Sequence, residues 1–101
     1  MKPLKLLYTA EARRLIRKLH PEIKQAIRCL IQEIFENPTQ GKALKGALLP
    51  FRSSRYSRYR VIYEYDVPNN CLIIHYVGRR KNIYALFEAF VRSYSAKDLT
   101  R

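Results

Sequence analysis

The chain has 101 residues and a formal net charge of +12 at neutral pH, and 48% of its residues are hydrophobic. A chain of this length buries roughly two-thirds of its unfolded surface on folding, so this apolar content excludes a disordered basic tail. No apolar run approaches the roughly 20 residues of a membrane span, and the N-terminus lacks the pattern of a signal peptide. We therefore expect one basic domain over residues 1–101, located in the cytoplasm, with no membrane partner.

The two cysteines, Cys29 and Cys71, stand alone in apolar stretches, with no CxxC spacing and no histidine at the interval of a metal ligand. Isolated cysteines of this kind are typical of reduced thiols in a protein core. We therefore expect neither a disulfide nor a metal site, and we expect the protein to need no cofactor.

Apolar periodicity predicts two helices in the first half of the chain, after a short strand in residues 1–8. Apolar residues recur at three- and four-residue intervals over residues 9–19, and Thr9 is a good N-cap for that helix. Pro21 suits the first position of a second helix, whose apolar stripe ends at Asn37. Because the connection between the two helices is so short, the pattern favours an antiparallel helical hairpin.

The second half of the chain favours strands over residues 48–55, 59–66 and 71–78. The last two of these segments are rich in β-branched and aromatic residues, and residues 67–70 have the composition of a hairpin turn. Apolar residues return to helical spacing over residues 82–94, which predicts a final helix. The order of the elements therefore predicts an α+β fold.

Basic residues gather in the strand-rich half. Between Glu36 and Glu64 the chain has no acidic residue, and a second basic cluster covers residues 79–81. The basic residues of that interval are Lys42, Lys45, Arg52, Arg55, Arg58 and Arg60. A stretch of positive charge without compensating acid favours binding to a polyanion, and the planar fork of arginine suits phosphate better than an ammonium group does.

Tyrosines lie among these arginines, and they allow two interpretations. Aromatic rings stack on unpaired bases while guanidinium groups hold phosphates, as expected for binding to single-stranded RNA. Alternatively, the strand tyrosines pack over the helices and the arginines form a solvated face. We favour the core role for any individual tyrosine and anion binding for the basic cluster as a whole.

Four segments of the second half follow one another along the chain. They are Leu44-Lys45-Gly46, Phe51-Arg52-Ser53-Ser54-Arg55, Tyr59-Arg60-Val61-Ile62-Tyr63 and Gly78-Arg79-Arg80-Lys81-Asn82-Ile83-Tyr84. In this order, the segments resemble the RelE/ParE superfamily of type II toxins. The resemblance implies an N-terminal helical hairpin packed on a small antiparallel β-sheet, with a C-terminal helix. It also implies a growth-arresting toxin with a cognate antitoxin. From the charge of this chain we expect that antitoxin to be acidic, to fold on binding and to form a hetero-oligomer with the toxin.

The resemblance leaves two targets open. RelE-like members cut messenger RNA on the ribosome, which would make this protein an endoribonuclease that needs no metal, with mRNA on the ribosome as its second partner. ParE-like members inhibit DNA gyrase without nuclease activity, and this is the alternative to the RelE-like function that we favour. By position, the resemblance assigns catalytic roles to Arg52, Arg55, Arg60, Arg80 and Tyr84. The expected RNA-binding residues are Lys45, Arg58, Arg79 and Lys81, whereas Lys42 lies farther from the motifs.

The sequence does not determine which side chain would accept the proton from the RNA 2′-hydroxyl. Arginine cannot readily act as a base because its pKa exceeds about 12. The candidates are Tyr84, Lys45, His75 and Glu64, of which His75 is a lone histidine in mid-strand and such residues are more often structural. Ser57 stands where many members of the superfamily carry glycine, and serine tolerates a positive φ less well than glycine does.

Overall fold

The computed structural model of the chain describes residues 3, 5–48, 50–79 and 83–98. In it, two N-terminal helices precede most of the strands along the chain, as the sequence predicts. The elements are β1 (Lys5–Tyr8), α1 (Ala10–Arg17), α2 (Pro21–Glu36), β2 (Lys42–Ala43), a 3-10 turn η1 (Gly46–Leu48), β3 (Arg52–Tyr56), β4 (Tyr59–Asp66), β5 (Cys71–Arg79) and α3 (Ile83–Asp98). The strand expected to begin at residue 48 begins instead at Arg52, because η1 occupies the residues before it. Strand β2 has only two residues and is too short to leave a periodic pattern.

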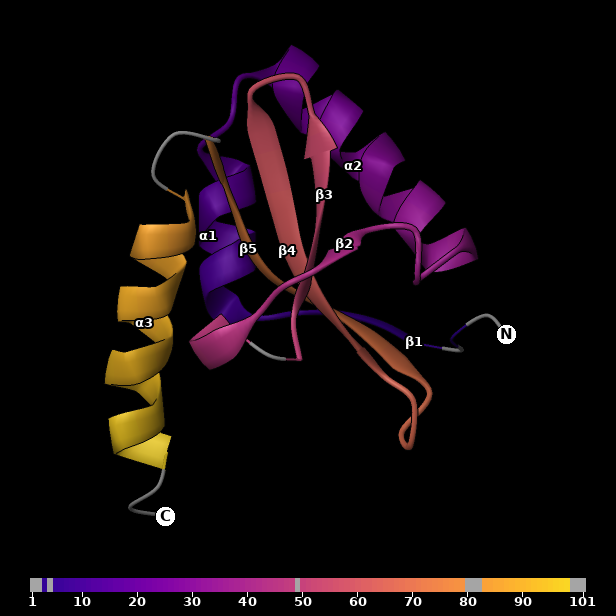
Figure 1. The fold of residues 1–101 in the computed structure, drawn as a ribbon. Coiled ribbons are helices and arrows are strands. Elements are labelled where there is room, and N and C mark those ends of the chain that lie inside the picture. The colour runs from indigo at the N-terminus through magenta and orange to yellow at the C-terminus, as the bar shows by residue number, and fades with distance from the viewer. Residues whose placement is uncertain (1–2, 4, 49, 80–82, 99–101) are drawn as a thin grey trace.

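The strands form one five-stranded sheet in the order β1-β5-β4-β3-β2 (Figure 1). Neighbouring strands from β2 to β5 pair antiparallel, in agreement with the expected meander, whereas β1 pairs parallel to β5 at the edge. Parallel pairing requires a crossover between the paired strands. Here the chain leaves β1 through α1 and α2, and it passes through the three other strands before it returns as β5.

Local sequence signals begin both N-terminal helices. The Thr9 hydroxyl accepts a hydrogen bond from the backbone N–H of Ala12 at 3.0 Å and donates one to the carbonyl oxygen of His75 at 3.1 Å, so this N-cap also ties α1 to β5. In front of Pro21, the His20 ring accepts from the backbone N–H of Glu22 at 3.2 Å. These caps satisfy backbone donors that have no partner within the helix.

The larger core lies between the sheet and the two N-terminal helices. Its buried members are Ala12 and Ile16 of α1, Ile27, Leu30, Ile31 and Ile34 of α2, Val61 and Tyr63 of β4, and Leu72, Ile74 and Val77 of β5. We refer to this side of the sheet as the helical face. The sequence places both cysteines in the core, and the structure corrects one of them. Cys71 is buried and Cys29 is exposed on α2, and both are free thiols.

A second core lies on the other side of the sheet, under α3, and we call this side the α3 face. It contains the buried residues Leu44, Leu48, Ile62, Ile83 and Phe87, with Phe51, Tyr76, Tyr84 and Val91 packed against them. Successive residues of a strand point to opposite faces, which is why Ile62 belongs to this core and its neighbours in β4 belong to the other.

A β-bulge in β5 changes the alternation between these faces. Ile62 pairs with Tyr76 and the next residue, Tyr63, pairs with Ile74, so His75 is the extra residue of β5. The His75 ring then lies on the α3 face, with its centroid 4.8 Å from that of Phe51. Within the described residues, no helix combines the length and apolar character of a membrane span.

Candidate functional site

Strand alternation divides the three arginines of β3 and β4 between the two faces of the sheet. Arg52 pairs with Tyr63, whereas Arg55 pairs with Arg60. Directly opposed residues of an antiparallel pair project to the same face. Arg52 therefore lies on the helical face with Tyr63, and Arg55 and Arg60 lie together on the α3 face.

Arg52 holds the loop that follows α2. Its Nη2 atom donates to the carbonyl oxygens of Thr39 and Gly41, each at 3.0 Å. Beside it, the buried Tyr63 hydroxyl donates to the carbonyl oxygen of Pro38 at 2.7 Å and accepts from the backbone N–H of Gly41 at 3.0 Å. Arg52 thus lies on the opposite face of the sheet from Arg55, Arg60 and Tyr84, and its guanidinium group holds this loop.

Tyr84, in the first turn of α3, contacts the α3 face through two side chains. Its hydroxyl lies 2.9 Å from the Ser53 hydroxyl, and either group can be the donor. The Arg60 guanidinium carbon lies 5.6 Å from the centre of the Tyr84 ring, within the range of a cation–π interaction. The buried Nε atoms of Arg60 and Arg52 both lack a hydrogen-bond partner in the described part of the chain. Of these two donors, only that of Arg60 belongs to the face on which Tyr84 lies.

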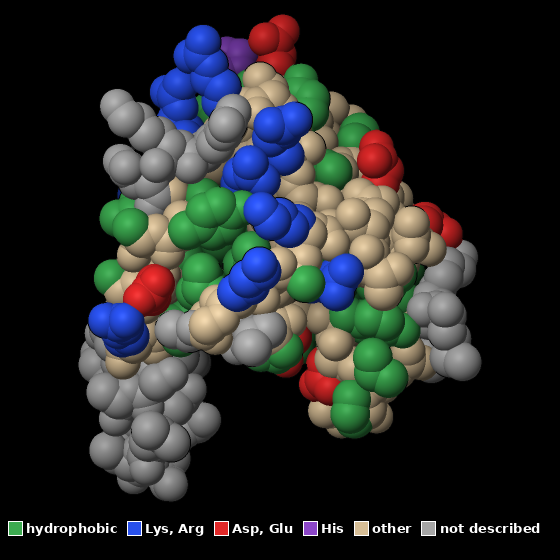
Figure 2. All heavy atoms as spheres, viewed as in Figure 1, with side chains coloured by type: hydrophobic (Ala, Val, Ile, Leu, Met, Phe, Trp, Pro, Cys, Tyr) green, Lys and Arg blue, Asp and Glu red, His purple; other side chains and the backbone are tan. Residues whose placement is uncertain are grey.

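An open hollow of about 260 Å³ lies beside Tyr84. The residues that line it are Lys42, Ala43, Leu44, Lys45, Leu48 and Tyr84. In the sequence, Lys42 lies farther from the motifs than the expected RNA-binding residues do. In the structure it pairs with Ser53 across β2 and β3, and so it lies on the same face as Tyr84. Figure 2 shows lysine and arginine side chains following one another in a row across this side of the molecule, next to a hydrophobic patch.

The remaining basic residues of the expected set do not all reach this face. Arg58 is exposed in the two-residue turn between β3 and β4. Arg79 pairs with Tyr59 and its guanidinium carbon lies 6.0 Å from the centre of that ring, on the helical face. The predictions for Arg80 and Lys81 fall outside the described residues. The structure therefore brings together Lys45, Arg55, Arg60 and Tyr84, and adds Lys42 and Ser53.

His75 and Glu64, two of the four candidate bases, bind each other. The Nε2 atom of His75 lies 3.1 Å from Oε1 of Glu64, and the imidazole ring packs edge-on against Phe51. Burial lowers the pKa of His75, an effect that Glu64 opposes by hydrogen bonding and charge. Tyr84 and Lys45 are the two candidates that line the hollow. Among the described residues, no three histidine, cysteine or acidic side chains converge in a way that could hold a metal ion.

Comparisons with solved structures identify the fold. The chain is similar to the toxin–antitoxin complex RelBE2 of Mycobacterium tuberculosis, with 30% identity and a TM-score of 0.72 over 79% of this chain and 94% of that one. It is also similar to a mutant of the Escherichia coli toxin RelE in the free state, with 21% identity and a TM-score of 0.73 over 91% of this chain and 98% of that one. The fold is therefore that of the RelE/ParE superfamily.

A family model described as the ParE-like toxin of type II bacterial toxin–antitoxin systems matches residues 6–87. No curated protein sequence matches the chain significantly. The family match covers most of the chain, including Tyr84 and the buried residues of both cores. The chain therefore belongs to the ParE-like toxin family of type II toxin–antitoxin systems, within the RelE/ParE superfamily that its motifs predict, and a cognate antitoxin is its expected partner.

Proposed function

We propose that this toxin arrests translation by cleaving mRNA on the ribosome, through attack of an RNA 2′-hydroxyl on the adjacent phosphate. The observation that carries the proposal is the contact of Tyr84 with Arg60 and Ser53 beside an open hollow that Lys45 also lines. A phenol, a guanidinium and an ammonium group thus lie near one another on one face. Such groups hold phosphate oxygens and transfer protons.

The reaction places specific demands on these groups. The 2′-oxygen forms a bond to phosphorus while the bond from phosphorus to the 5′-oxygen breaks, which leaves a 2′,3′-cyclic phosphate and a 5′-hydroxyl. The 2′-hydroxyl gives its proton to a base, and the departing 5′-oxygen takes one up. Negative charge grows on the phosphate oxygens, and we assign its stabilisation to Arg55 and Arg60, which pair with each other across β3 and β4.

We assign proton transfer to the Tyr84 hydroxyl and phosphate contact to Lys45. His75 and Glu64 are occupied with each other, whereas Tyr84 and Lys45 line the hollow. A phenol is a poor base at neutral pH, and a lysine side chain is then almost entirely in its ammonium form, which cannot accept a proton. The chemistry therefore needs help from positioning. An ordered substrate contributes several kcal/mol to lowering such a barrier, and the decoding site would supply that order. This is why we propose that cleavage depends on the ribosome.

Arg80 and Lys81 enter the proposal from the resemblance alone, Arg80 as a further catalytic arginine and Lys81 as an RNA contact. Arg58, exposed at the tip of the β3–β4 hairpin, would extend the basic row toward a longer RNA segment. Such electrostatic contacts position a nucleic acid without reading its sequence. Arg79, on the helical face, would contact RNA only beyond the proposed site.

A second function, inhibition of DNA gyrase without nuclease activity, is favoured by one observation. The matching family model carries the ParE-like description. In this alternative the Tyr84–Arg60 contact would only dock α3 on the sheet, and its loss would affect stability more than growth arrest.

Induction of the wild type and of three variants tests the proposal. Tyr84→Phe and Arg60→Ala should strongly reduce cleavage of translated mRNA, mapped by primer extension, while the proteins stay folded. Arg14→Ala is the matched control, because it removes one charge from the outside of α1, where Arg14 is paired with Glu11. Translation arrest without DNA damage supports the nuclease. DNA damage without mRNA cleavage, or full toxicity of both site variants, favours the gyrase target.

A further inference from the structure

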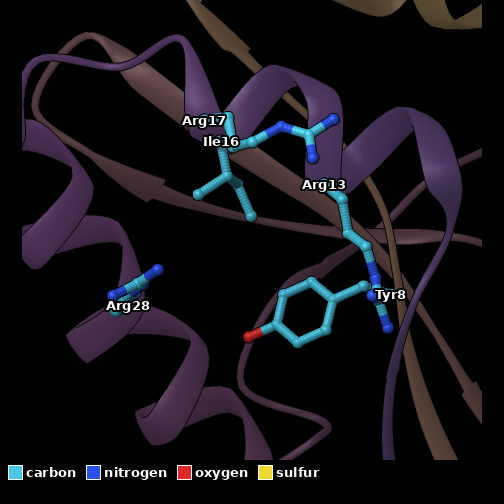
Figure 3. A pocket seen from close by; sticks show the side chains of 5 residues that line it. All are labelled: Tyr8, Arg13, Ile16, Arg17 and Arg28. Atoms are coloured by element: carbon cyan, nitrogen blue, oxygen red, sulfur yellow. The ribbon is translucent and has the colours of Figure 1, made fainter.

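A second basic pocket lies on the helical face, between β1, α1 and α2. It has a volume of about 500 Å³ and is lined by Tyr8, Arg13, Ile16, Arg17 and Arg28 (Figure 3). Tyr8 and Ile16 belong to the core under the helices, whereas Tyr84 belongs to the core under α3. The sheet therefore separates this pocket from the proposed RNA-binding face.

Three arginines from two helices reach this pocket. Arg13 and Arg17 are four residues apart on α1 and so lie on the same side of that helix, while Arg28 comes from α2 on the other side of the pocket. Figure 3 shows the Tyr8 ring between them, with its hydroxyl directed toward Arg28. Burial raises the pKa of Tyr8, and the positive charges of Arg28 and Arg13 partly oppose this shift.

None of the described residues that line the pocket carries a negative charge. The ion pairs between described residues are Glu11 with Arg14, Glu64 with His75, and Glu88 with Arg92, and none involves a pocket arginine. Glu11, although it lies on α1, has both carboxylate oxygens bonded to Arg14. Three guanidinium groups of like charge around one cavity repel one another, and an anionic ligand relieves that repulsion.

We propose that this pocket binds aspartate or glutamate side chains of an acidic segment of the antitoxin. The floor, formed by Ile16 and the Tyr8 ring, is apolar, and the rim carries the guanidinium groups. An amphipathic acidic segment matches both parts, because its apolar residues cover the floor and its carboxylates form forked hydrogen bonds with arginine. RNA held at Tyr84 lies on the opposite side of the sheet, so this pocket stays available to the antitoxin.

This inference rests on the antitoxin partnership and not on the nuclease chemistry. Contacts at the helical face contribute affinity for the antitoxin while leaving the α3 face intact. Loss of the pocket charges should therefore produce a toxin that is still active and is poorly neutralised.

The test compares two double variants with the wild type. Arg13→Ala/Arg28→Ala removes two charges from the pocket, and Arg14→Ala/Lys18→Ala removes two from α1 outside the pocket lining. The probes are the antitoxin encoded next to this toxin and a 20-nucleotide oligouridylate. We expect the pocket variant to bind the antitoxin about tenfold more weakly or worse, with a smaller dependence on salt concentration. Its affinity for the RNA and its toxicity without antitoxin should stay within about twofold of wild type.

Two outcomes overturn the proposal. If the pocket variant binds the antitoxin as tightly as the control variant does, the pocket is not an antitoxin contact. If it loses RNA affinity and keeps antitoxin affinity, the pocket is part of an RNA surface. Arg13 and Arg28 are exposed and should not be needed for folding, and Arg28→Gln provides a milder variant should the double variant melt early. A toxin that arrests growth without cutting mRNA would disprove the nuclease and leave this test unaffected.

Discussion

The hydroxyl groups of Ser53 and Tyr84 lie 2.9 Å apart and connect β3 to the first turn of α3. Ser53 is almost fully buried, with 2% of its surface exposed, so this hydrogen bond is shielded from water on the Ser53 side. The position of the Tyr84 hydroxyl therefore depends on how α3 packs on the sheet.

Separate substitutions distinguish the chemistry of Tyr84 from its positioning. Tyr84→Phe should lower single-turnover cleavage on programmed ribosomes by a factor on the order of 10², because it removes the group that transfers the proton. Ser53→Ala keeps the phenol and should cost less than about tenfold, a range in which positioning alone is affected. Equal losses of cleavage rate in the two variants would show that the rate depends on the hydrogen bond between Ser53 and Tyr84 and not on proton transfer by the phenol.

Substitutions of Arg52 and Arg55 should have different effects, one on the stability of the fold and the other on cleavage activity. Arg52→Ala removes two hydrogen bonds from the loop after α2 and should lower the free energy of unfolding by about 1–3 kcal/mol. Cleavage measured well below the melting temperature should remain close to wild type. Arg55→Ala, at an exposed position on the α3 face, should leave stability nearly unchanged and reduce cleavage. A stable, inactive Arg52→Ala protein would restore the catalytic role that the resemblance implies.

Ser57 is strained in the turn between β3 and β4. Its φ is 53°, a left-handed conformation that L-residues other than glycine adopt at a cost. Ser57→Gly should raise the free energy of unfolding by about 0.5–1 kcal/mol, after the greater freedom of glycine in the unfolded chain is included. Asn70 is the matched control. It has a φ of 55°, and Asn70→Gly should gain less because asparagine visits this region more readily. Urea titrations would show a larger midpoint shift for Asn70→Gly if this explanation is wrong.

His75 should make the fold sensitive to acid. Burial lowers its pKa below the ordinary value of 6.5, and Glu64 opposes the shift. The folded protein therefore binds fewer protons than the unfolded chain as the pH falls below that value, so the free energy of unfolding decreases. Urea midpoints between about pH 7.5 and about pH 5 should fall, and His75→Gln should reduce the slope. An identical slope in the variant would assign the acid sensitivity to other groups.

Much of the fold could be predicted from local signals. Thr9 and Pro21 begin helices where expected, and the paired strands β4 and β5 follow their β-branched and aromatic runs. The core role favoured for an individual tyrosine is confirmed for Tyr63, whereas Tyr56 is exposed. Strand β2 could not be predicted, because two residues carry no alternation, and with it the placement of Lys42 beside Tyr84 was missed.

Arg52 and Arg55, which motif order groups together, lie on opposite faces of the sheet. The two residues are three positions apart in a strand, and an odd separation places side chains on opposite faces. This signal was present in the sequence, although motif order alone does not use it. The partner of Tyr84 could not have been found in the same way, since Ser53 and Tyr84 meet only when α3 packs on the sheet.

His75, the extra residue in β5, reverses which face of the sheet the odd- and even-numbered side chains of that strand point to. Before it, Leu72 and Ile74 point to the helical face at even positions; after it, Val77 does so at an odd one. If His75 instead took a regular place in the ladder, every later residue of β5 would turn over. Val77 would then lie under α3, and Arg79 would lie on the proposed RNA-binding face. One unpaired residue therefore determines which side of the sheet receives the positive charge at the end of β5.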